Sequence, residues 1–272
     1  MANILDREVW AFDCEWVPSI EAGRSVYGLP SDCPDDEVLR TMYEAQGATL
    51  ENPRPFLRTA YCRIASIAMV IRKKRMPGAS ESQLQLFALP NAFDDENCRE
   101  ATILKRFSKG LALHSPILVG YNSRASDLRI LLQRSLINGI SAPELFSRVN
   151  GKPWECEDID LMEKICGMGR SYSVSLNDIS RMCSIPGKLD MCGDDVCGAW
   201  YRGERESIVQ YNCFDALTTY LLWLRVCKIQ GLLDDANYAL EQQAVKRLLE
   251  NEIGNGKTYL QTFLDAWNPS FE

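Results

Sequence analysis

The sequence predicts a single mixed α/β domain. Three strand-like segments come first, and helical segments then alternate with short apolar strands before a late helical stretch. The length of 272 residues is enough for one large domain with an ample core. We therefore expect one domain over residues 1–272, with a core at about 8–226 and a helical tail at 227–272.

The first predicted strand, Val9–Val17, carries two carboxylates inside an apolar run, VWAFDCEWV. Side chains of a strand alternate between its faces, so Asp13 and Glu15 point the same way, about 7 Å apart. The bulky residues Trp10, Phe12, Cys14 and Trp16 share the opposite face. A polar face turned to water is the ordinary explanation for such a pair, but two valines and an alanine share the carboxylate face.

A polar excursion is predicted from Pro18 to Arg58, with one short helix that begins at its Asp/Pro run. We expect it to cross the surface without joining the core. An Ile- and Val-rich strand follows at 61–73, and a strand at 84–90 completes a hairpin with Pro77-Gly78 at its tip. The basic run at 72–75 is more typical of a solvated hairpin end than of a nucleic-acid patch.

The remaining elements are mostly helical. Helices are predicted at 94–113, 126–139, 175–185, 205–231 and 234–254, and short strands at 116–122 and 158–162. Ser126 is the expected N-cap of its helix, and Gly139 lies near the end of that helix.

Composition excludes several classes of protein. The charged N-terminal stretch runs straight into the first strand, so we expect no signal peptide, and no apolar run approaches the ~20 residues of a membrane helix. Eleven cysteines then predict a reducing, cytoplasmic compartment. A zinc site is not expected, because there is no Cys-x-x-Cys and only one histidine, His114. The net charge of −7 argues against a broad basic surface for duplex DNA.

Two further acids occupy positions that suit a functional site. Asp127 follows Ser126 where a strand gives way to a helix, and ligands collect at the carboxyl ends of strands in α/β sheets. Tyr211 and Asp215 are four residues apart and share one face of a largely apolar helix. A buried Asp needs a partner, and no Lys or Arg lies three or four residues from Asp215. A metal ion would supply that partner.

The four acids together predict a metal site. Converging carboxylates at Asp13, Glu15, Asp127 and Asp215 would repel one another unless cations sit between them. Two divalent ions remove that repulsion, and a pair of ions ~4 Å apart is the usual clamp for phosphodiester hydrolysis.

The ordered set resembles the DnaQ-like exonucleases, which are named for an Asp-Glu-Asp-Asp set. AFDCEW matches their first motif, GYNSRASDLRILLQR the second and YNCFDALTTY the third, and the Tyr four residues before the last Asp marks the tyrosine subclass. The link at 175–196, with its Pro-Gly-Lys, is similar to predicted 3′–5′ exonucleases related to the proofreading domains of family B polymerases. The resemblance covers roughly Val9 to Arg225.

This resemblance implies a ribonuclease H-like fold with a five-stranded mixed sheet flanked by helices, and a cofactor of two Mg²⁺ or Mn²⁺ ions. It implies that Asp13, Glu15 and Asp215 hold one metal, that Asp13 bridges to a second, and that Asp127 supports the second. Tyr211 would orient the attacking water.

Two residues are candidates for substrate binding. Trp16 stands where the family often has Thr, and it either stacks on a terminal base or anchors the core. Asn122 matches an Asn of the second motif, and it either bonds the nucleotide or serves as a turn residue.

We therefore expect a 3′–5′ exodeoxyribonuclease acting on single-stranded DNA. The alternatives are an exoribonuclease on short RNA, and a non-catalytic nucleic-acid-binding or polymerase-tethering module on the same fold. A polymerase or repair protein is a possible partner, and no membrane is expected. The Gly256-Lys257-Thr258 run does not indicate a phosphate-binding loop, because Asn251 replaces the required Gly and a helix precedes it.

Overall fold

The computed structural model describes residues 6–74, 82–151, 157–167, 172–189 and 193–267. At its centre is a five-stranded sheet with the order β3-β2-β1-β4-β5. The strands are β1 (Val9–Pro18), β2 (Cys62–Arg72), β3 (Leu84–Leu89), β4 (Ile117–Gly120) and β5 (Ile159–Asp160). The first three pair antiparallel, while β4 runs parallel to β1 and β5 parallel to β4. The five-stranded mixed sheet flanked by helices that the sequence predicts is confirmed.

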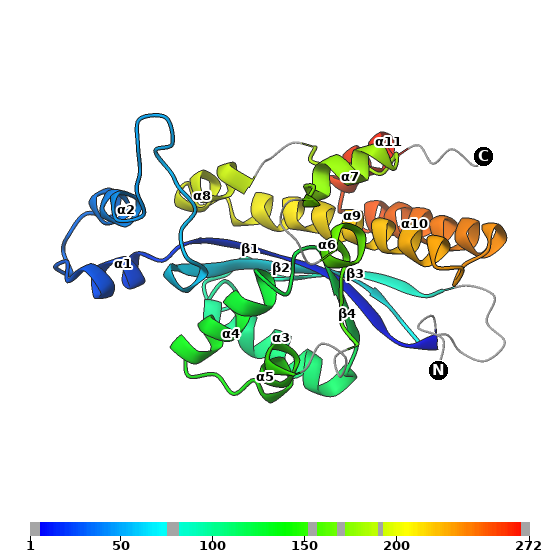
Figure 1. Cartoon of the computed structure of the whole chain (residues 1–272), viewed down its shortest axis with the longest axis horizontal. Coiled ribbons are helices and arrows are strands. Elements are labelled where there is room, and N and C mark those ends of the chain that lie inside the picture. The colour runs from blue at the N-terminus through cyan, green and yellow to red at the C-terminus, as the bar shows by residue number, and fades with distance from the viewer. Residues whose placement is uncertain (1–5, 75–81, 152–156, 168–171, 190–192, 268–272) are drawn as a thin grey trace.

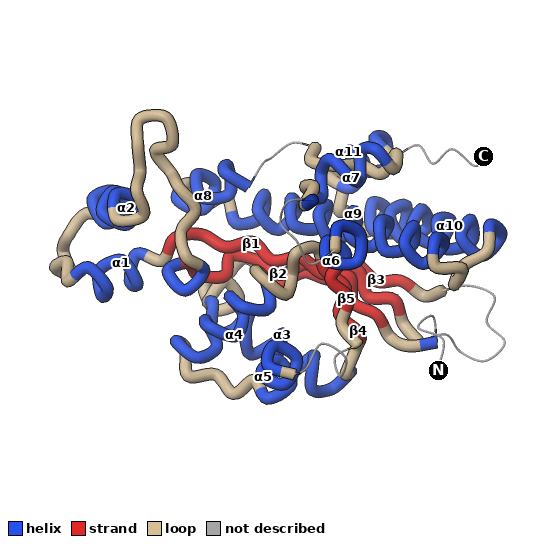
Figure 2. The backbone as a smooth tube through the Cα atoms, in the orientation of Figure 1, coloured by secondary structure: helices blue, strands red, loops and turns tan. Residues whose placement is uncertain are grey.

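Helices cover both faces of this sheet (Figure 1, Figure 2). One face carries α7 (Leu176–Met182), α8 (Gly193–Tyr201), α9 (Arg205–Ile229), α10 (Asp235–Gly254) and α11 (Leu260–Ala266). The other carries α3 (Glu100–His114), α4 (Asp127–Ile137) and α5 (Pro143–Asn150), and the short α6 (Leu161–Cys166) follows β5. Helices α5, α6, α8 and α11 were not predicted from the sequence.

The two faces of β1 belong to different hydrophobic cores, as strand alternation predicts. Val9 and Ala11 pack in the cluster that contains α9, while Trp10 and Phe12 pack in the cluster that contains α3 and α4. The side of β1 that carries the two carboxylates therefore faces α9.

The excursion is more ordered than we expected. After β1 it forms α1 (Ile20–Tyr27) and α2 (Asp35–Glu44), and a single 3₁₀ turn, η2 (Thr59–Tyr61), leads into β2. The prediction that it stays out of the core was wrong, because Val38 and Met42 are fully buried in the α3/α4 cluster. These two residues are four apart and share one face of α2. Gly23 allows the two helices to approach, since a Cβ there would lie 2.5 Å from Cγ1 of Val38.

Several predicted boundaries differ from the structure because side chains cap turns locally. The helix expected at 94–113 begins only at Glu100, since the Asp94 carboxylate accepts the N–H groups of Glu96 and Asn97 in a preceding turn. The strand expected at 158–162 ends at Asp160, whose carboxylate caps α6. The predicted Pro77-Gly78 turn lies outside the described residues.

The C-terminal tail contributes buried side chains to the hydrophobic core on the α9 side of the sheet. Val245, Leu249, Leu260 and Phe263 are fully buried in the α9 cluster. An ion pair of 2.8 Å between the buried side chains of Arg72 on β2 and Glu241 on α10 joins the tail to the sheet. Tyr220 on α9 donates a further hydrogen bond to the Glu241 carboxylate.

Replacing Glu241 with Ala should destabilise the protein strongly. The change leaves the Arg72 guanidinium buried without this carboxylate, and breaking a buried ion pair on one side typically costs about 3–5 kcal/mol. Urea denaturation would measure the loss. Glu204→Ala, which breaks an exposed pair with Arg202, is the matched control and should leave the midpoint close to that of the wild type. Equal midpoints for the two variants would contradict a structural role for the tail.

Candidate active site

Three of the expected metal ligands meet at one point. Asp13 and Glu15 project from β1 toward α9, and Asp215 projects from α9 toward β1. One carboxylate oxygen from each lies within 4.8 Å of the other two. All three side chains are half-buried and line a cleft of about 520 Å³.

Asp127 lines the same cleft from the first turn of α4, and its carboxyl group is held on both sides. Its Oδ1 accepts the backbone N–H of Cys14 at 3.1 Å, and its Oδ2 accepts the Ser126 hydroxyl at 2.7 Å. Ser126 is thus at the predicted N-cap position but bonds Asp127 instead of capping the helix. Because β4 is parallel to β1, α4 begins beside the carboxylates of β1.

Tyr211 lies one helical turn before Asp215, and the two side chains are close enough for each to shift the pKa of the other. Its ring packs with Val17 and Ala65, so that it is buried while its side chain still borders the cleft. Burial, followed by the charges of Asp215 and Glu15, raises the pKa of Tyr211. The phenol therefore stays protonated near neutral pH.

The carboxylates hinder one another's ionisation. Burial first, and then the charges of Asp127 and Asp215, raise the pKa of Asp13 well above its usual range. Burial and the charge of Asp215 do the same to the pKa of Glu15. Burial raises the pKa of both Asp127 and Asp215 to about 6. Shifts of this kind collect at functional sites.

Lys188 is a site residue that the sequence reasoning did not assign. Its positive charge lowers the pKa of Asp13, Glu15 and Asp215, although burial outweighs it. Lys188 does not lie within one helical turn of Asp215 but in the Pro-Gly-Lys turn that follows α7. The sequence signal that could have identified Lys188 is this Pro-Gly-Lys, which is part of the resemblance to the exonuclease family.

The Pro-Gly-Lys turn is fixed by polar contacts. Thr218 on α9 donates to the carbonyl of Pro186 at 2.8 Å, and the N–H of Lys188 donates to Oδ1 of Asn177 at 2.9 Å. A Cβ on Gly187 would lie 2.3 Å from that same Oδ1, so the turn can approach α7 only with glycine there.

The two substrate-binding candidates are placed differently. Trp16 lines the cleft, just after a bulge between Glu15 and Trp16, and also packs against the α3/α4 cluster. Asn122 is in a left-handed conformation with φ of 56° at the end of β4 and does not line the cleft. Its N–H donates to Asp160 and its carbonyl accepts the Ser126 hydroxyl, which orders the turn that leads to Asp127.

The residues present fit divalent metal ions. Carboxylate oxygens are the ligands that Mg²⁺ and Mn²⁺ prefer, and three of them already converge without a full countercharge. Burial and mutual repulsion disfavour the charged forms of these groups, which is why their pKa values are raised. Bound cations would offset both effects.

Comparison with known families assigns the chain. A model for a family described as "predicted 3′-5′ exonuclease related to the exonuclease domain of PolB" matches residues 54–267. The chain belongs to this family. The match includes Asp127, Lys188, Tyr211 and Asp215 and extends through the tail, beyond the range of the resemblance seen in the sequence. It begins after β1, so Asp13 and Glu15 lie outside it.

Among solved structures, the chain is similar to the family B DNA polymerase from the hyperthermophilic archaeon Pyrobaculum calidifontis. The TM-score is 0.48 and the identity 14%, over 88% of this chain and 27% of the polymerase chain. The chain thus spans about a quarter of that polymerase. No curated protein matches. In the described parts of the chain, every helix is too short or too polar to cross a membrane.

The metal-free protein should lose stability as the pH rises from about 4 to about 6. Asp127 and Asp215 have a pKa of about 6 when folded, against about 3.9 in an unfolded chain. In this window the folded state binds more protons than the unfolded state, so the free energy of unfolding falls with rising pH.

Urea denaturation in EDTA across this window would measure the slope. Asp127→Asn removes one titrating group while its amide oxygen still accepts the N–H of Cys14, so the slope should become shallower. Saturating Mn²⁺ should oppose the fall in the wild type. Slopes that are equal with and without Asp127 would contradict its raised pKa.

Proposed function

We propose that this protein is a metal-dependent 3′–5′ exonuclease that hydrolyses phosphodiester bonds at the 3′ ends of single-stranded DNA with two Mg²⁺ or Mn²⁺ ions. The observation that carries the proposal is the meeting of Asp13, Glu15 and Asp215 in one cleft, with Asp127 on its wall. Membership of a family described as predicted 3′–5′ exonucleases supports the same activity.

The four acids would divide the binding of two ions between them. Asp13, Glu15 and Asp215 would hold one ion, because their oxygens converge. Asp13 would also reach a second ion that Asp127 supports. When bound, two such ions lower the pKa of an attacking water and stabilise the charge that develops on the phosphate. The bonds from Cys14 and Ser126 fix the Asp127 carboxylate before any ion arrives.

Tyr211 orients the attacking water. Its side chain borders the cleft beside Asp215, and the lone pairs of the phenol oxygen would accept a hydrogen bond from a water there. Because its pKa is raised, Tyr211 positions the water but does not remove its proton.

The substrate is a single strand with a free 3′ end. The likeness to proofreading domains favours DNA, and the net charge of −7 does not suit a broad grip on a duplex. RNA is the alternative substrate, since that choice depends on contacts to the 2′-OH. We place the protein in a reducing, cytoplasmic compartment, with a polymerase or repair protein as its partner.

A 5′-labelled single-stranded oligonucleotide tests the activity directly. With Mg²⁺ or Mn²⁺ it should shorten to a descending ladder, and it should persist in EDTA or with Asp13→Ala. Parallel DNA and RNA strands of one sequence would decide the sugar preference. Release of the label in the first step, or digestion unchanged by EDTA, would rule out the proposal.

Tyr211→Phe separates orientation of the water from folding. The change removes one oxygen and keeps the packed ring, so stability and Mn²⁺ binding should survive. Single-turnover cleavage should slow by roughly 10²–10⁴-fold, the range typical of lost proton or water positioning. Substrate affinity should hardly change, because the hydroxyl acts in the transition state. Cleavage at the wild-type rate would remove Tyr211 from the mechanism.

A further inference from the structure

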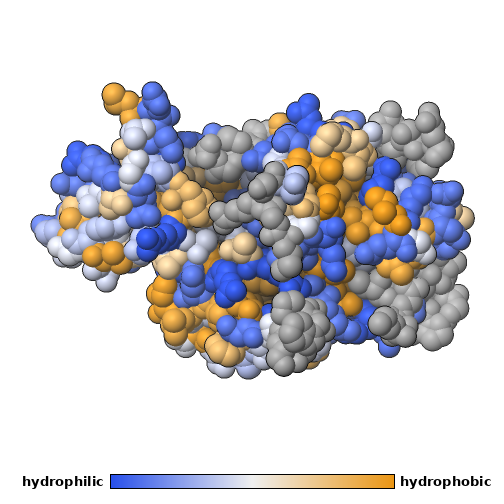
Figure 3. Space-filling model, in the orientation of Figure 1, coloured by the Kyte–Doolittle hydropathy of each residue, from blue (hydrophilic) through white to orange (hydrophobic). Residues whose placement is uncertain are grey.

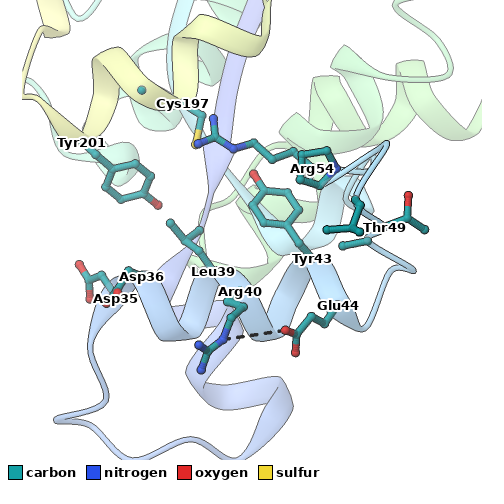
Figure 4. Close-up of a pocket in the computed structure, with 14 residues that line it drawn as sticks. Asp35, Asp36, Leu39, Arg40, Tyr43, Glu44, Thr49, Arg54, Cys197 and Tyr201 are labelled. Atoms are coloured by element: carbon teal, nitrogen blue, oxygen red, sulfur yellow. Dashed lines mark ion pairs between the residues drawn. The ribbon is translucent and has the colours of Figure 1, made fainter.

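A second cavity lies apart from the acidic cleft, between the excursion and α8 (Figure 4). Its volume is about 980 Å³, and its walls come from α2, the segment 48–54 and α8. Leu39, Leu50 and Pro53 give it an apolar lining. In Figure 3 the excursion projects from the body of the molecule on the left, and its surface mixes hydrophilic and hydrophobic residues.

Two aromatic rings and a cation line the cavity. Tyr43 and Tyr201 border the cavity from opposite sides, and the Arg54 guanidinium lies between α8 and Tyr43 (Figure 4). Tyr201 remains 41% exposed although its ring is large and apolar. Within the described residues, Arg54 has no carboxylate at ion-pair distance. Its charge acts on Tyr43 and Cys197, lowering the pKa of both groups against the larger effect of burial.

This cavity lies next to the C-terminal end of β1, the strand that carries Asp13 and Glu15. The Tyr201 hydroxyl donates to the carbonyl of Pro18, the last residue of β1, at 3.3 Å. Pro18 is three residues after Glu15, which is about 10 Å along a strand. Trp16, between them, already lines the acidic cleft. A single strand whose 3′ end lies at the acids therefore needs to extend by only a few nucleotides to reach Tyr201.

We propose that this cavity is a second nucleotide subsite, which binds an internal nucleotide on the 5′ side of the bond being cut. The inference rests on the proposed exonuclease function. A base would stack on the exposed ring of Tyr201 and the phosphate chain would run past Arg54. Aromatic rings beside an unpaired cation are the usual elements of single-strand binding.

The charges around the cavity indicate which of its walls the phosphates of a bound nucleic acid would follow. The carboxylates of Asp35 and Asp36 lie across the cavity from Arg54 (Figure 4). Asp35 is paired with Arg24 at 2.7 Å. The phosphates would therefore follow the α8 wall. The rival occupant is a basic protein segment, which would be attracted because the seven carboxylates of residues 19–58 outnumber the four arginines there.

The test measures binding and cleavage separately. In an Asp13→Ala background without metal, fluorescence anisotropy would follow a labelled oligo-dT octamer. Tyr201→Ala should weaken its binding by roughly 5- to 100-fold for the lost stacking, and Arg54→Ala should also weaken it because a phosphate contact is lost. Tyr201→Phe keeps the ring and should bind like the parent. Arg58→Ala removes the same charge from the excursion but outside the cavity, and it is the matched control.

In the otherwise wild-type enzyme, the same two variants should cut the octamer with a raised KM and cut a dinucleotide as before, because the dinucleotide cannot reach the cavity. Unchanged octamer binding in both variants would overturn the subsite even if the enzyme is an exonuclease. Weakened binding in a protein that cuts nothing would instead overturn the proposed function and keep the subsite. Tyr201-dependent binding of a Lys-Leu repeat peptide, with octamer binding unaffected, would assign the cavity to a protein partner.

Discussion

The repulsion among carboxylates forced into one cleft is the constraint on which the rest of this structure depends. Asp13 and Glu15 cannot turn away from Asp215, because the bulky face of β1 is committed to the opposite core and α9 is buried along most of its length. Burial and the neighbouring charges raise the pKa of Asp13 and Glu15 well above their usual range. Lys188 offsets this in part. The fold therefore holds a site whose natural complement is a divalent cation.

Two buried ion pairs keep the elements of the site in place from either side of the sheet. On the α9 side, Arg72 and Glu241 join β2 to α10, and Tyr220 connects the pair to α9 itself. On the other side, Glu100 of α3 accepts two bonds from Arg134 of α4 and one from the N–H of Ile64 on β2. Helix α4, which begins with Asp127, is thus tied to the sheet at both ends. Pairs of this kind are costly to break on one side, which favours a rigid frame around the acids.

Much of this arrangement follows from local rules that a sequence displays. Alternation along Val9–Val17 predicted which face carries the carboxylates, and the four-residue spacing of Tyr211 and Asp215 predicted that they share a face. The sequence did not predict that Lys188 lines the same cleft as the acids, because its position depends on a distant turn that packs against α9. Nor did it predict the burial of Val38 and Met42, since a two-residue apolar stripe in a polar segment becomes core only when Gly23 admits it. The predicted ends of two elements differ from the observed ones because the side chains of Asp94 and Asp160 accept backbone N–H groups there. In each case one hydrogen-bonding side chain outweighs the propensity of its neighbours.

The roles of Trp16 and Asn122 remain predictions, whereas the position of the metal can be measured directly. Crystals grown with Mn²⁺ and measured with X-rays at the manganese absorption edge would give an anomalous difference map of the cleft. The account predicts a strong peak among the carboxylates of Asp13, Glu15 and Asp215, and a second peak on the side of Asp127 when a nucleotide is bound. A map with manganese bound elsewhere and no peak among these three carboxylates would contradict the central claim that the acids converge to hold metal.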